Sequence, residues 1–558
     1  MLDYKRYKRV PVVDFPERTW PNKEIEKAPI WCSVDLRDGN QALIEPMVVE
    51  EKIEFFNLLV KLGFKEIEVG FPSASQLEFD FLRSLVERNL IPEDVTVQVL
   101  VQCREHLLKR TFEALEGIPR AIVHIYNSTS TLQREAVFHM SREEIKQIAI
   151  EGTKLVKQYA KDFPGKIILE YSPESFTGTE LDYALEVCTA VQEVWEPTPE
   201  NPMIINLPST VEMNTPNVYA DQIEWMSTHF KNRDSIILSV HPHNDRGTGV
   251  AAAELSLLAG ADRVEGTLFG NGERTGNVDI LNIAYNMFSQ GINPELEIED
   301  INEIMEVYER LCKLPIHERH PYAGKLVFTA FSGSHQDAIN KGIMAMQERN
   351  DGYWEVPYLP IDPADIGRKY EPLVRINSQS GKGGVAFVMD TYFGFKLPKA
   401  MHKEFADIIQ GISEKQGEVA PEQIMNEFRN SYLEQKEPYH FRSLSMEEVH
   451  VDENNTSTKV CVTYTVNGVE RSFHAAGNGP IDAVLNGIRR DIGKQLRLID
   501  YTEHALSLGS NAQAAAYIHM LDAETGKTTF GVGVSSNITR ASVRAIFSAM
   551  NRIIKMNR

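Results

Sequence analysis

Short apolar runs alternate with longer amphipathic stretches from residue 31 onward. Ile53, Phe56 and Leu59 recur at the spacing of one helix face, which predicts a helix between the first two runs. Eight such strand–helix repeats predict a (β/α)8 barrel over residues 31–310. A doubly wound α/β sheet is the alternative, but it requires a glycine-rich phosphate loop after its first strand, and the sequence lacks that loop. The predicted strands are residues 31–36, 66–69, 96–101, 121–125, 166–170, 203–206, 236–240 and 263–266.

Three further segments flank the predicted barrel. Residues 1–30 are polar and contain several prolines, which predicts an extended strap. Helical periodicity dominates residues 311–435, apart from a turn-rich linker at 362–384. Alternating strand and helix patterns over residues 436–558 predict a second, α+β domain. Its predicted strands are residues 447–452, 460–466, 471–474, 512–522 and 528–534, and its predicted helices are residues 481–499 and 539–554.

Composition narrows the class of protein. The 558 residues carry a net charge of -21, and an acidic chain repels nucleic acid and anionic membranes, so we expect neither as a partner. No apolar run is long enough to cross a bilayer, and residues 1–10 lack the apolar segment of a signal peptide. The five cysteines are scattered without C-x-x-C spacing, which is typical of a reducing compartment. These features predict a cytoplasmic protein.

Two histidines mark the end of the seventh predicted strand. Side chains two residues apart on a strand share a face, so His241 and His243 present two imidazoles to one point. Strands one, seven and eight become neighbours when the barrel closes, which brings Asp38 and Asn277 within reach of that point. Imidazole and oxygen ligands suit Mg²⁺, Mn²⁺ or Zn²⁺. A divalent metal site is therefore predicted here, whereas the histidine pair alone is also typical of an ordinary turn.

Other polar residues follow the predicted strands. Arg37 adjoins Asp38, where a guanidinium is suited to neutralise a bound carbonyl or carboxylate, although a plain salt bridge is the alternative. His124 lies near the end of strand four, and polar segments at 170–175 and 206–210 follow strands five and six. Active sites of (β/α)8 barrels lie at the carboxyl ends of the strands, so this distribution favours an enzyme.

Several of these segments resemble a known family. Residues 35–41 (DLRDGNQ), 241–245 (HPHND) and 270–277 (GNGERTGN) are similar to the metal-dependent Claisen-condensing barrels, which include α-isopropylmalate, homocitrate and citramalate synthases and related lyases. Residues 172–180 (SPESFTGTE) and 207–212 (LPSTVE) extend the resemblance, which is closest to the α-isopropylmalate synthases and covers nearly the whole chain. The related lyases use a cysteine after strand eight, and this chain has none there.

The resemblance implies a reaction. α-Isopropylmalate synthases join acetyl-CoA to α-ketoisovalerate (3-methyl-2-oxobutanoate) and hydrolyse the thioester, which yields 2-isopropylmalate and CoA at the entry to leucine biosynthesis. The implied cofactor is a divalent metal, with Mg²⁺ preferred, and the metal and Arg37 would polarise the keto group. A base must also remove a proton from the acetyl methyl group.

The resemblance also implies roles for individual residues. Glu174 is implied as a base or an orienting carboxylate near the chemistry. His335 is implied as a base or relay and Tyr370 as a proton donor, both from outside the barrel and reaching an active site of the same or the partner subunit. Plain helix capping is the alternative for His335. The residues implied in the keto-acid pocket are His124, Ser172 and Thr210.

The segments 475–480 and 531–538 resemble the turns of a leucine-binding regulatory domain, which implies end-product inhibition by leucine and a homodimer. Plain hairpin turns are the alternative reading of these glycine-rich segments. The functions that remain open are a citramalate synthase that accepts pyruvate, a metal-dependent lyase or aldolase, and a catalytically idle barrel that senses leucine. The idle barrel predicts lost metal ligands, but all four predicted ligands are present.

Overall fold

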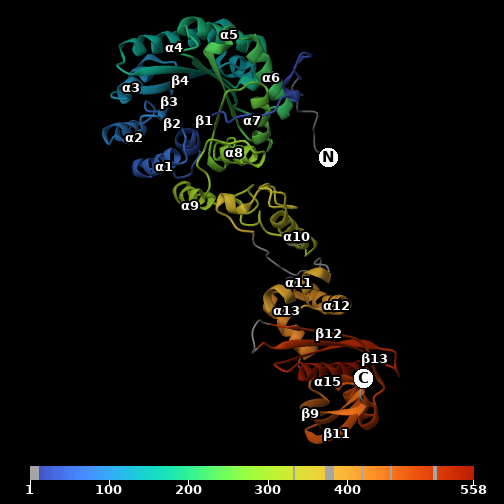
Figure 1. Ribbon diagram of the computed structural model, residues 1–558. Coiled ribbons are helices and arrows are strands. Elements are labelled where there is room, and N and C mark those ends of the chain that lie inside the picture. The colour runs from blue at the N-terminus through green and yellow to red at the C-terminus, as the bar shows by residue number, and fades with distance from the viewer. Residues whose placement is uncertain are drawn as a thin grey trace. The chain divides into compact units, whose positions relative to one another are not determined.

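The computed structural model describes residues 12–330, 333–370, 382–416, 419–433, 435–452, 455–506 and 512–557. The chain divides into two compact units (Figure 1). The first spans Met1–Phe328 and Ile361–Lys369, and the second spans Thr329–Pro360 and Tyr370–Arg558. None of the described helices combines the length and the apolar character needed to cross a membrane.

The first unit contains a closed barrel of eight parallel strands in chain order, in which β1 pairs with both β2 and β8. This confirms the predicted (β/α)8 fold and finds a strand at each predicted position. Most residues of the strands are buried, because helices cover the outer face of a parallel barrel. The strands are β1 (Ile30–Ser33), β2 (Glu66–Gly70), β3 (Thr96–Gln102), β4 (Arg120–Ser128), β5 (Lys166–Glu174), β6 (Met203–Ser209), β7 (Ile236–Pro242) and β8 (Arg263–Gly266).

Helices α1–α8 surround the strands (Figure 1), and α9 follows them. In α1 the predicted apolar stripe of Ile53, Phe56 and Leu59 is buried. Side-chain caps fix several helix starts; for example, the Ser141 hydroxyl accepts a hydrogen bond from the Glu144 backbone at the start of α4. The helices are α1 (Val49–Lys61), α2 (Gln76–Glu87), α3 (Glu105–Ala114), α4 (Arg142–Asp162), α5 (Leu181–Trp195), α6 (Pro216–His229), α7 (Gly249–Leu258), α8 (Ile280–Ser289) and α9 (Ile301–Cys312).

The described part of the predicted strap, from residue 12, is anchored to α6; residues 1–11 lie outside the described residues. The Thr19 backbone and hydroxyl both donate hydrogen bonds to the carboxylate of Glu224, at 2.8 and 2.5 Å. The indole nitrogen of Trp20 donates to Asp221 at 2.8 Å. Two buried carboxylates of one helix therefore hold this otherwise exposed segment.

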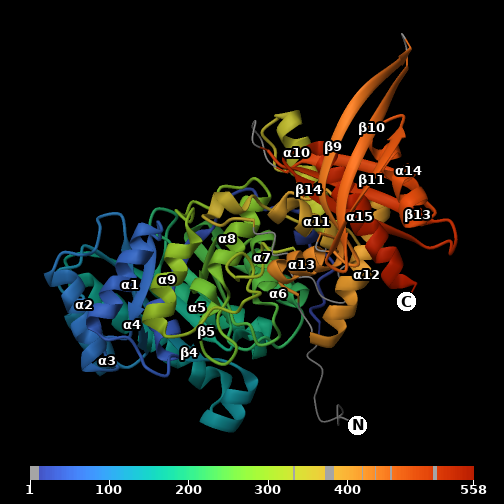
Figure 2. The ribbon, with the colours of Figure 1, turned by 90° about the horizontal axis from the view of Figure 1, so that it is seen from below.

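The second unit begins with helices and ends with two small antiparallel sheets, which agrees with the predicted helical region and α+β domain. The sheets have the orders β11-β10-β9 and β12-β13-β14, and β9 and β10 run side by side over a long distance (Figure 2). The elements are α10 (Gly333–Arg349), α11 (Lys382–Phe393), α12 (Lys399–Gln416), α13 (Pro421–Phe428), β9 (Tyr439–Asp452), β10 (Asn455–Val466), β11 (Val469–Gly477), α14 (Pro480–Gly487), β12 (Leu496–Ala505), β13 (Ala514–Asp522), β14 (Thr528–Ser535) and α15 (Ile538–Met556).

Two apolar clusters hold the second unit together. One cluster joins a face of each sheet to α14 and α15, through residues such as Val462, Ile518 and Ile546. The other joins the opposite face of the second sheet to α11–α13, through residues such as Tyr517 and Phe428. The sheet β12-β13-β14 is therefore covered on both faces, which accounts for the apolar character of β13 and β14.

Three predictions for the chain beyond the barrel were wrong in detail. The helix predicted at 481–499 ends early, because Gly493 adopts a left-handed φ of 73° and Leu496–Ala505 pairs with β13 as strand β12. Gly531 and Gly533 lie within β14 and not in a turn; a side chain at either position would collide with the backbone of α15. The linker predicted at 362–384 ends where α11 begins at Lys382, and residues 371–381 lie outside the described part of the chain.

Candidate active site

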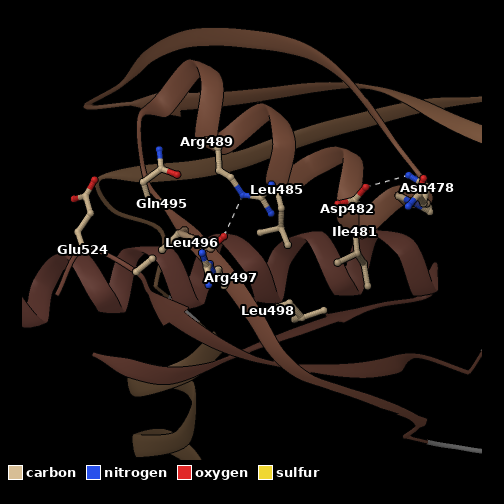
Figure 3. Close-up of a pocket in the computed structure, with 13 residues that line it drawn as sticks. Asn478, Ile481, Asp482, Leu485, Arg489, Gln495, Leu496, Arg497, Leu498 and Glu524 are labelled. Atoms are coloured by element: carbon tan, nitrogen blue, oxygen red, sulfur yellow. Dashed lines mark hydrogen bonds between the residues drawn. The ribbon is translucent and has the colours of Figure 1, made fainter. Parts of the chain in front are cut away.

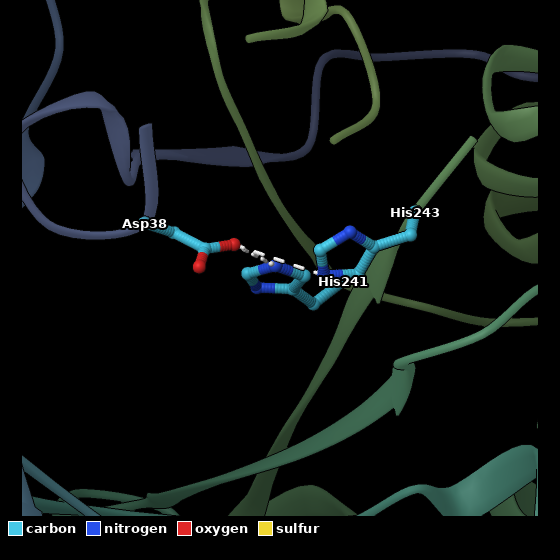
Figure 4. A group of neighbouring side chains, drawn as sticks. All are labelled: Asp38, His241 and His243. Atoms are coloured by element: carbon cyan, nitrogen blue, oxygen red, sulfur yellow. Dashed lines mark hydrogen bonds and ion pairs between the residues drawn. The ribbon is translucent and has the colours of Figure 1, made fainter. Parts of the chain in front are cut away.

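Three buried side chains converge on one point (Figure 4), from the ends of β1 and β7, which flank β8 in the closed barrel. His241 is on β7 and His243 follows it, and their rings are 5.4 Å apart. Asp38 comes from the π-helical turn Asp35–Gly39, which follows β1. Its Oδ2 atom lies 3.3 Å from His241 Nε2 and 3.7 Å from His243 Nε2. The alternation of side chains along the strand thus brings both imidazoles to the carboxylate, as predicted.

Asn277 completes this group from the loop after β8. Its Oδ1 atom lies 2.9 Å from His241 Nε2, and a backbone bridge ties Asn277 to His243. Two imidazoles, a carboxylate and an amide oxygen form a donor set that suits a divalent cation with open positions for substrate. His243 Nδ1 is also buried and makes no hydrogen bond to any described residue. The group therefore fits a divalent metal.

The electrostatics of the ligand group are strongly coupled. Burial opposes the charge of Asp38, but Arg37 and His241 outweigh it and hold the pKa of Asp38 well below its usual range. Burial likewise opposes a charged His241, yet its hydrogen bonds to Asp38 and Glu265 raise its pKa to about 10. Burial and the neighbouring His241 lower the pKa of His243 to about 4. The pKa values of the two imidazoles are therefore shifted in opposite directions by their contacts with Asp38, Glu265 and each other.

Arg37 is held between two acids. Its Nη1 donates to Asp38 at 2.8 Å, and its Nε donates to Glu68 of β2. The side chain of Arg37 is 12% exposed, and that exposed part lines the cavity beside the ligand group. The salt bridge with Asp38 is therefore present, and the same guanidinium also lines the cavity.

A cavity of about 410 Å³ adjoins these residues, and all three residues implied in the keto-acid pocket, His124, Ser172 and Thr210, line it. His124 Nε2 lies 2.7 Å from the Ser172 hydroxyl, which also accepts a hydrogen bond from Asn206 at 3.0 Å. The Thr210 hydroxyl accepts a hydrogen bond from the Ser175 backbone at 2.9 Å. Glu174, at the end of β5, accepts a hydrogen bond from Ser128. These groups form one polar wall of the cavity.

A layer of buried charged residues lies beneath the cavity, and the sequence interpretation missed it. Glu68 accepts a hydrogen bond from Gln98 at 2.7 Å, and its carboxylate lies 3.0 Å from His124 Nδ1. Arg263 is fully buried and pairs with Glu265 at 2.8 Å. Burial raises the pKa of Glu170, and the nearby charge of Glu265 raises it further. The available signal was the polar residue at every second position of several strands, such as Arg263 and Glu265.

His335 and Tyr370 belong to the second unit, so the barrel alone does not contain them. His335 is exposed on α10, and its ring stacks on Tyr358 with a centroid distance of 4.2 Å. The Tyr370 hydroxyl is buried and makes no hydrogen bond to a described residue. The remaining predicted site residues line the barrel cavity, except Asn277, which contacts His241 beside it.

A second cavity, of about 1000 Å³, lies in the terminal α+β part of the second unit (Figure 3). The start of α14 and the first residues of β12 form much of its wall. Ile481, Leu485 and Leu498 supply apolar surface, and Asp482 and Arg497 supply opposite charges. Asp482 accepts a hydrogen bond from the Asn478 backbone at 3.0 Å, which fixes its carboxylate at the edge of the cavity. Part of the predicted regulatory segment 475–480 thus lines a cavity of mixed polarity.

Comparison with protein families finds three matches along the chain. Residues 28–307 match the HMGL-like family, residues 325–390 match the post-catalytic domain-like family of alpha-isopropylmalate synthase, and residues 418–554 match the LeuA allosteric (dimerisation) domain. Among solved structures, the hydroxymethylglutaryl-CoA lyase from Pseudomonas aeruginosa is 19% identical with a TM-score of 0.42, over 52% of this chain and 93% of that chain.

Curated relatives match over nearly the full length. The 2-isopropylmalate synthase of Clostridium acetobutylicum is 56% identical, over 98% of this chain and 99% of the relative. The 2-isopropylmalate synthases of Rhizobium johnstonii and Brucella suis biovar 1 are each 54% identical, over 98% of this chain and 98% and 99% of the relatives. With the barrel, the buried ligand group and all three domain matches in one chain, this protein belongs to the 2-isopropylmalate synthase family.

Proposed function

We propose that the chain is an acyltransferase that condenses acetyl-CoA with α-ketoisovalerate to form 2-isopropylmalate, the entry reaction of leucine biosynthesis. The observation that carries the proposal is the convergence of Asp38, His241 and His243 beside Arg37 at the cavity floor. The acetyl methyl group loses a proton, its carbon bonds to the keto carbon, and the alkoxide takes up a proton. Water then cleaves the thioester, which releases the carboxylate and the thiol of CoA.

Arg37 is proposed to stabilise the charge that develops on the keto oxygen. When bound, a divalent cation, with Mg²⁺ the proposed ion, supplies Lewis-acid polarisation at the ligand group. Arg37 is held in place by Glu68 and Asp38 before substrate arrives, so its guanidinium needs little reorganisation as charge develops. The proposed ligands of the cation are Asp38, His241, His243 and Asn277.

The polar wall of the cavity is proposed to bind the keto acid. The Thr210 hydroxyl accepts from the Ser175 backbone, which leaves its hydrogen for the substrate carboxylate. His124 and Ser172 form a hydrogen-bonded pair beside it and orient the keto acid in the cavity. A planar 2-oxo acid in this cavity therefore meets these polar groups as well as Arg37.

The proton transfers are assigned to residues from both units. Glu174 is proposed as the base, or as the carboxylate that orients it, because it lies at the cavity wall at the end of β5. His335 is proposed as a relay and Tyr370 as the proton donor to the alkoxide. The match to a dimerisation domain supports a homodimer, in which either subunit's His335 and Tyr370 serve the site.

Leucine is proposed as a feedback inhibitor that binds the second cavity. Its isobutyl group suits Ile481 and Leu485, its ammonium group suits Asp482, and its carboxylate suits Arg497. The match to a LeuA allosteric domain supports this assignment. Asp482→Asn is expected to weaken leucine inhibition by about tenfold, the worth of one charged hydrogen bond, with unchanged activity in the absence of leucine. Inhibition by leucine at wild-type concentrations in this variant would contradict the assignment.

The proposed reaction is tested by measuring the release of the CoA thiol and the mass of the product. Full-length protein with Mg²⁺, acetyl-CoA and α-ketoisovalerate should release one thiol per molecule of 2-isopropylmalate. His243→Ala should lose metal and turnover but retain the thermal unfolding temperature of the metal-free wild type. A failure of the wild-type protein to form 2-isopropylmalate would overturn the proposal, as would full turnover by metal-stripped His243→Ala.

A further inference from the structure

The two ring nitrogens of His241 face different partners. Nε2 faces Asp38 and Asn277, at 3.3 and 2.9 Å, where the cation is proposed to bind. Nδ1 faces Oε2 of Glu265 at 2.7 Å, on the opposite side of the ring. A carboxylate on Nδ1 keeps the proton on that nitrogen, so the lone pair of a neutral imidazole resides on Nε2.

Glu265 cannot turn away from His241, because other donors fix both of its oxygens. Its Oε1 accepts from Arg263 at 2.8 Å and from Gln98 at 3.0 Å. Its Oε2 accepts from Asn206 at 3.2 Å in addition to its contact with His241. Glu265 is fully buried, so water does not compete for these hydrogen bonds.

The cation that neutralises this layer is Arg263. His124, Glu170 and Glu265 offer ligand atoms close enough together to suggest a second metal site. The guanidinium of Arg263, however, lies 2.8 Å from Glu265 and 3.5 Å from Glu170. A divalent ion in the same place would meet this fixed positive charge, so the carboxylates are matched to the arginine and not to a second metal.

We propose that Glu265 is a positioning residue of the metal site, which holds His241 in the tautomer whose Nε2 lone pair faces the cation. Glu265 touches neither cation nor substrate and acts only through His241. This inference rests on the proposed metal site. Loss of a comparable outer partner of a metal-binding histidine typically weakens metal binding 10- to 100-fold.

Glu265→Gln is the sharpest test, because the surrounding hydrogen-bond donors determine which side of the glutamine amide carries its oxygen. Arg263 and Gln98 both donate to the Oε1 side, so the glutamine oxygen is held there and its NH₂ group faces His241. That NH₂ group donates to Nδ1 and drives the imidazole proton to Nε2, the nitrogen that the cation needs. The variant therefore keeps the shape of the core but selects the wrong tautomer.

Glu170→Gln is the matched control. Glu170 lies in the same buried layer and faces the same Arg263, but its carboxyl oxygens make no hydrogen bond to described residues, and it does not contact a proposed metal ligand. Both variants remove one carboxyl group beside Arg263. A general disturbance of the packing around Arg263 would therefore weaken metal binding in both, whereas the positioning role affects Glu265→Gln alone.

The measurement is a titration of full-length, metal-stripped protein with Mn²⁺, in which electron paramagnetic resonance counts the free ion. The expected result is a Kd for Glu265→Gln that is 10- to 100-fold above wild type, with Glu170→Gln within threefold, and recovery of thiol release by Glu265→Gln at saturating Mn²⁺. If Glu265→Gln does not fold, Glu265→Asp, which draws the carboxylate away from Nδ1, should show the same loss.

Three results would contradict the inference or its premise. A Kd for Glu265→Gln within threefold of wild type overturns the positioning role and leaves the proposed metal site intact. An equal loss in both variants also overturns it, because a general disturbance of the buried layer around Arg263 would then be the cause. Absence of Mn²⁺ binding by the wild-type protein overturns the proposed metal site itself.

Discussion

Replacement of Arg37 by lysine removes the hydrogen-bond donor proposed to face the keto acid, and it keeps a positive charge between Asp38 and Glu68. The guanidinium uses Nη1 for Asp38 and Nε for Glu68, and its Nη2 makes no hydrogen bond among the described residues, which leaves it for the keto acid. A lysine has a single nitrogen and cannot hold both carboxylates and reach the substrate. Loss of one donor to a developing oxyanion costs about 10²- to 10³-fold in kcat, or about 2.7–4 kcal/mol of activation free energy.

The assay is thiol release at saturating acetyl-CoA, α-ketoisovalerate and Mg²⁺. Arg233→Lys is the matched control, because Arg233 precedes β7 at the opposite end of the strand and also makes several hydrogen bonds, to Ser227, Asp262 and two backbone carbonyls. It should lower the free energy of unfolding without a change in kcat. A kcat for Arg37→Lys within threefold of wild type would refute the role of Arg37, and so would an equal loss of kcat in the control.

Further predictions concern proton release, pH-dependent stability and substrate affinity. Because the pKa of His241 is about 10 and that of His243 is about 4, Mn²⁺ binding at pH 7.5 should release one proton. Calorimetry in buffers of different ionisation enthalpy measures the number of protons released. Release of none or of two protons would contradict this prediction. Burial raises the pKa of Asp35 to about 7, so the unfolded chain deprotonates first and the free energy of unfolding falls as pH rises from about 4 to about 7. Asp35→Asn has no carboxyl group to titrate, so its free energy of unfolding should not fall in this way. The difference in free energy of unfolding between the variant and the wild type should therefore shift by about 2 kcal/mol in favour of the variant from pH 5.5 to pH 7. A difference that stays constant over this range would contradict the raised pKa of Asp35. Ser172→Ala removes the hydroxyl paired with His124 and should raise the KM for α-ketoisovalerate about tenfold with a smaller change in kcat; an unchanged KM would place the keto acid elsewhere.

The barrel and its ligand group were predictable because both follow from short periodicities. Eight buried strands separated by helical patterns define the closed sheet, and the two-residue repeat of a strand brings His241 and His243 to one face. Asp38 joins them because β1 and β8 become neighbours only in a closed barrel. These inferences needed nothing beyond the order of the strands.

The residues beneath the site were not predictable in the same way. Glu68 and Glu265 lie inside strands, where a single glutamate normally indicates a solvent-facing position, and only the three-dimensional pairing with Arg37 and Arg263 makes their burial tolerable. Strand β12 was missed because an apolar spacing compatible with a helix runs past Gly493, whose left-handed backbone ends that helix. Local pattern thus identified the ligands but not the tertiary partners that hold them.

The most direct test of the proposed reaction is to determine which keto acid the protein condenses with acetyl-CoA. Thiol release from acetyl-CoA should be measured with α-ketoisovalerate, pyruvate and 2-oxoglutarate, with Mg²⁺ and with and without leucine. Each additional methylene in an apolar pocket is worth about 10- to 200-fold in kcat/KM, and the side chain of α-ketoisovalerate is larger than that of pyruvate by the equivalent of two. The kcat/KM for α-ketoisovalerate should therefore exceed that for pyruvate by at least about 100-fold, and leucine should slow the reaction. A preference for pyruvate would make the protein a citramalate synthase, and absence of thiol release with every acceptor would contradict the condensing reaction altogether.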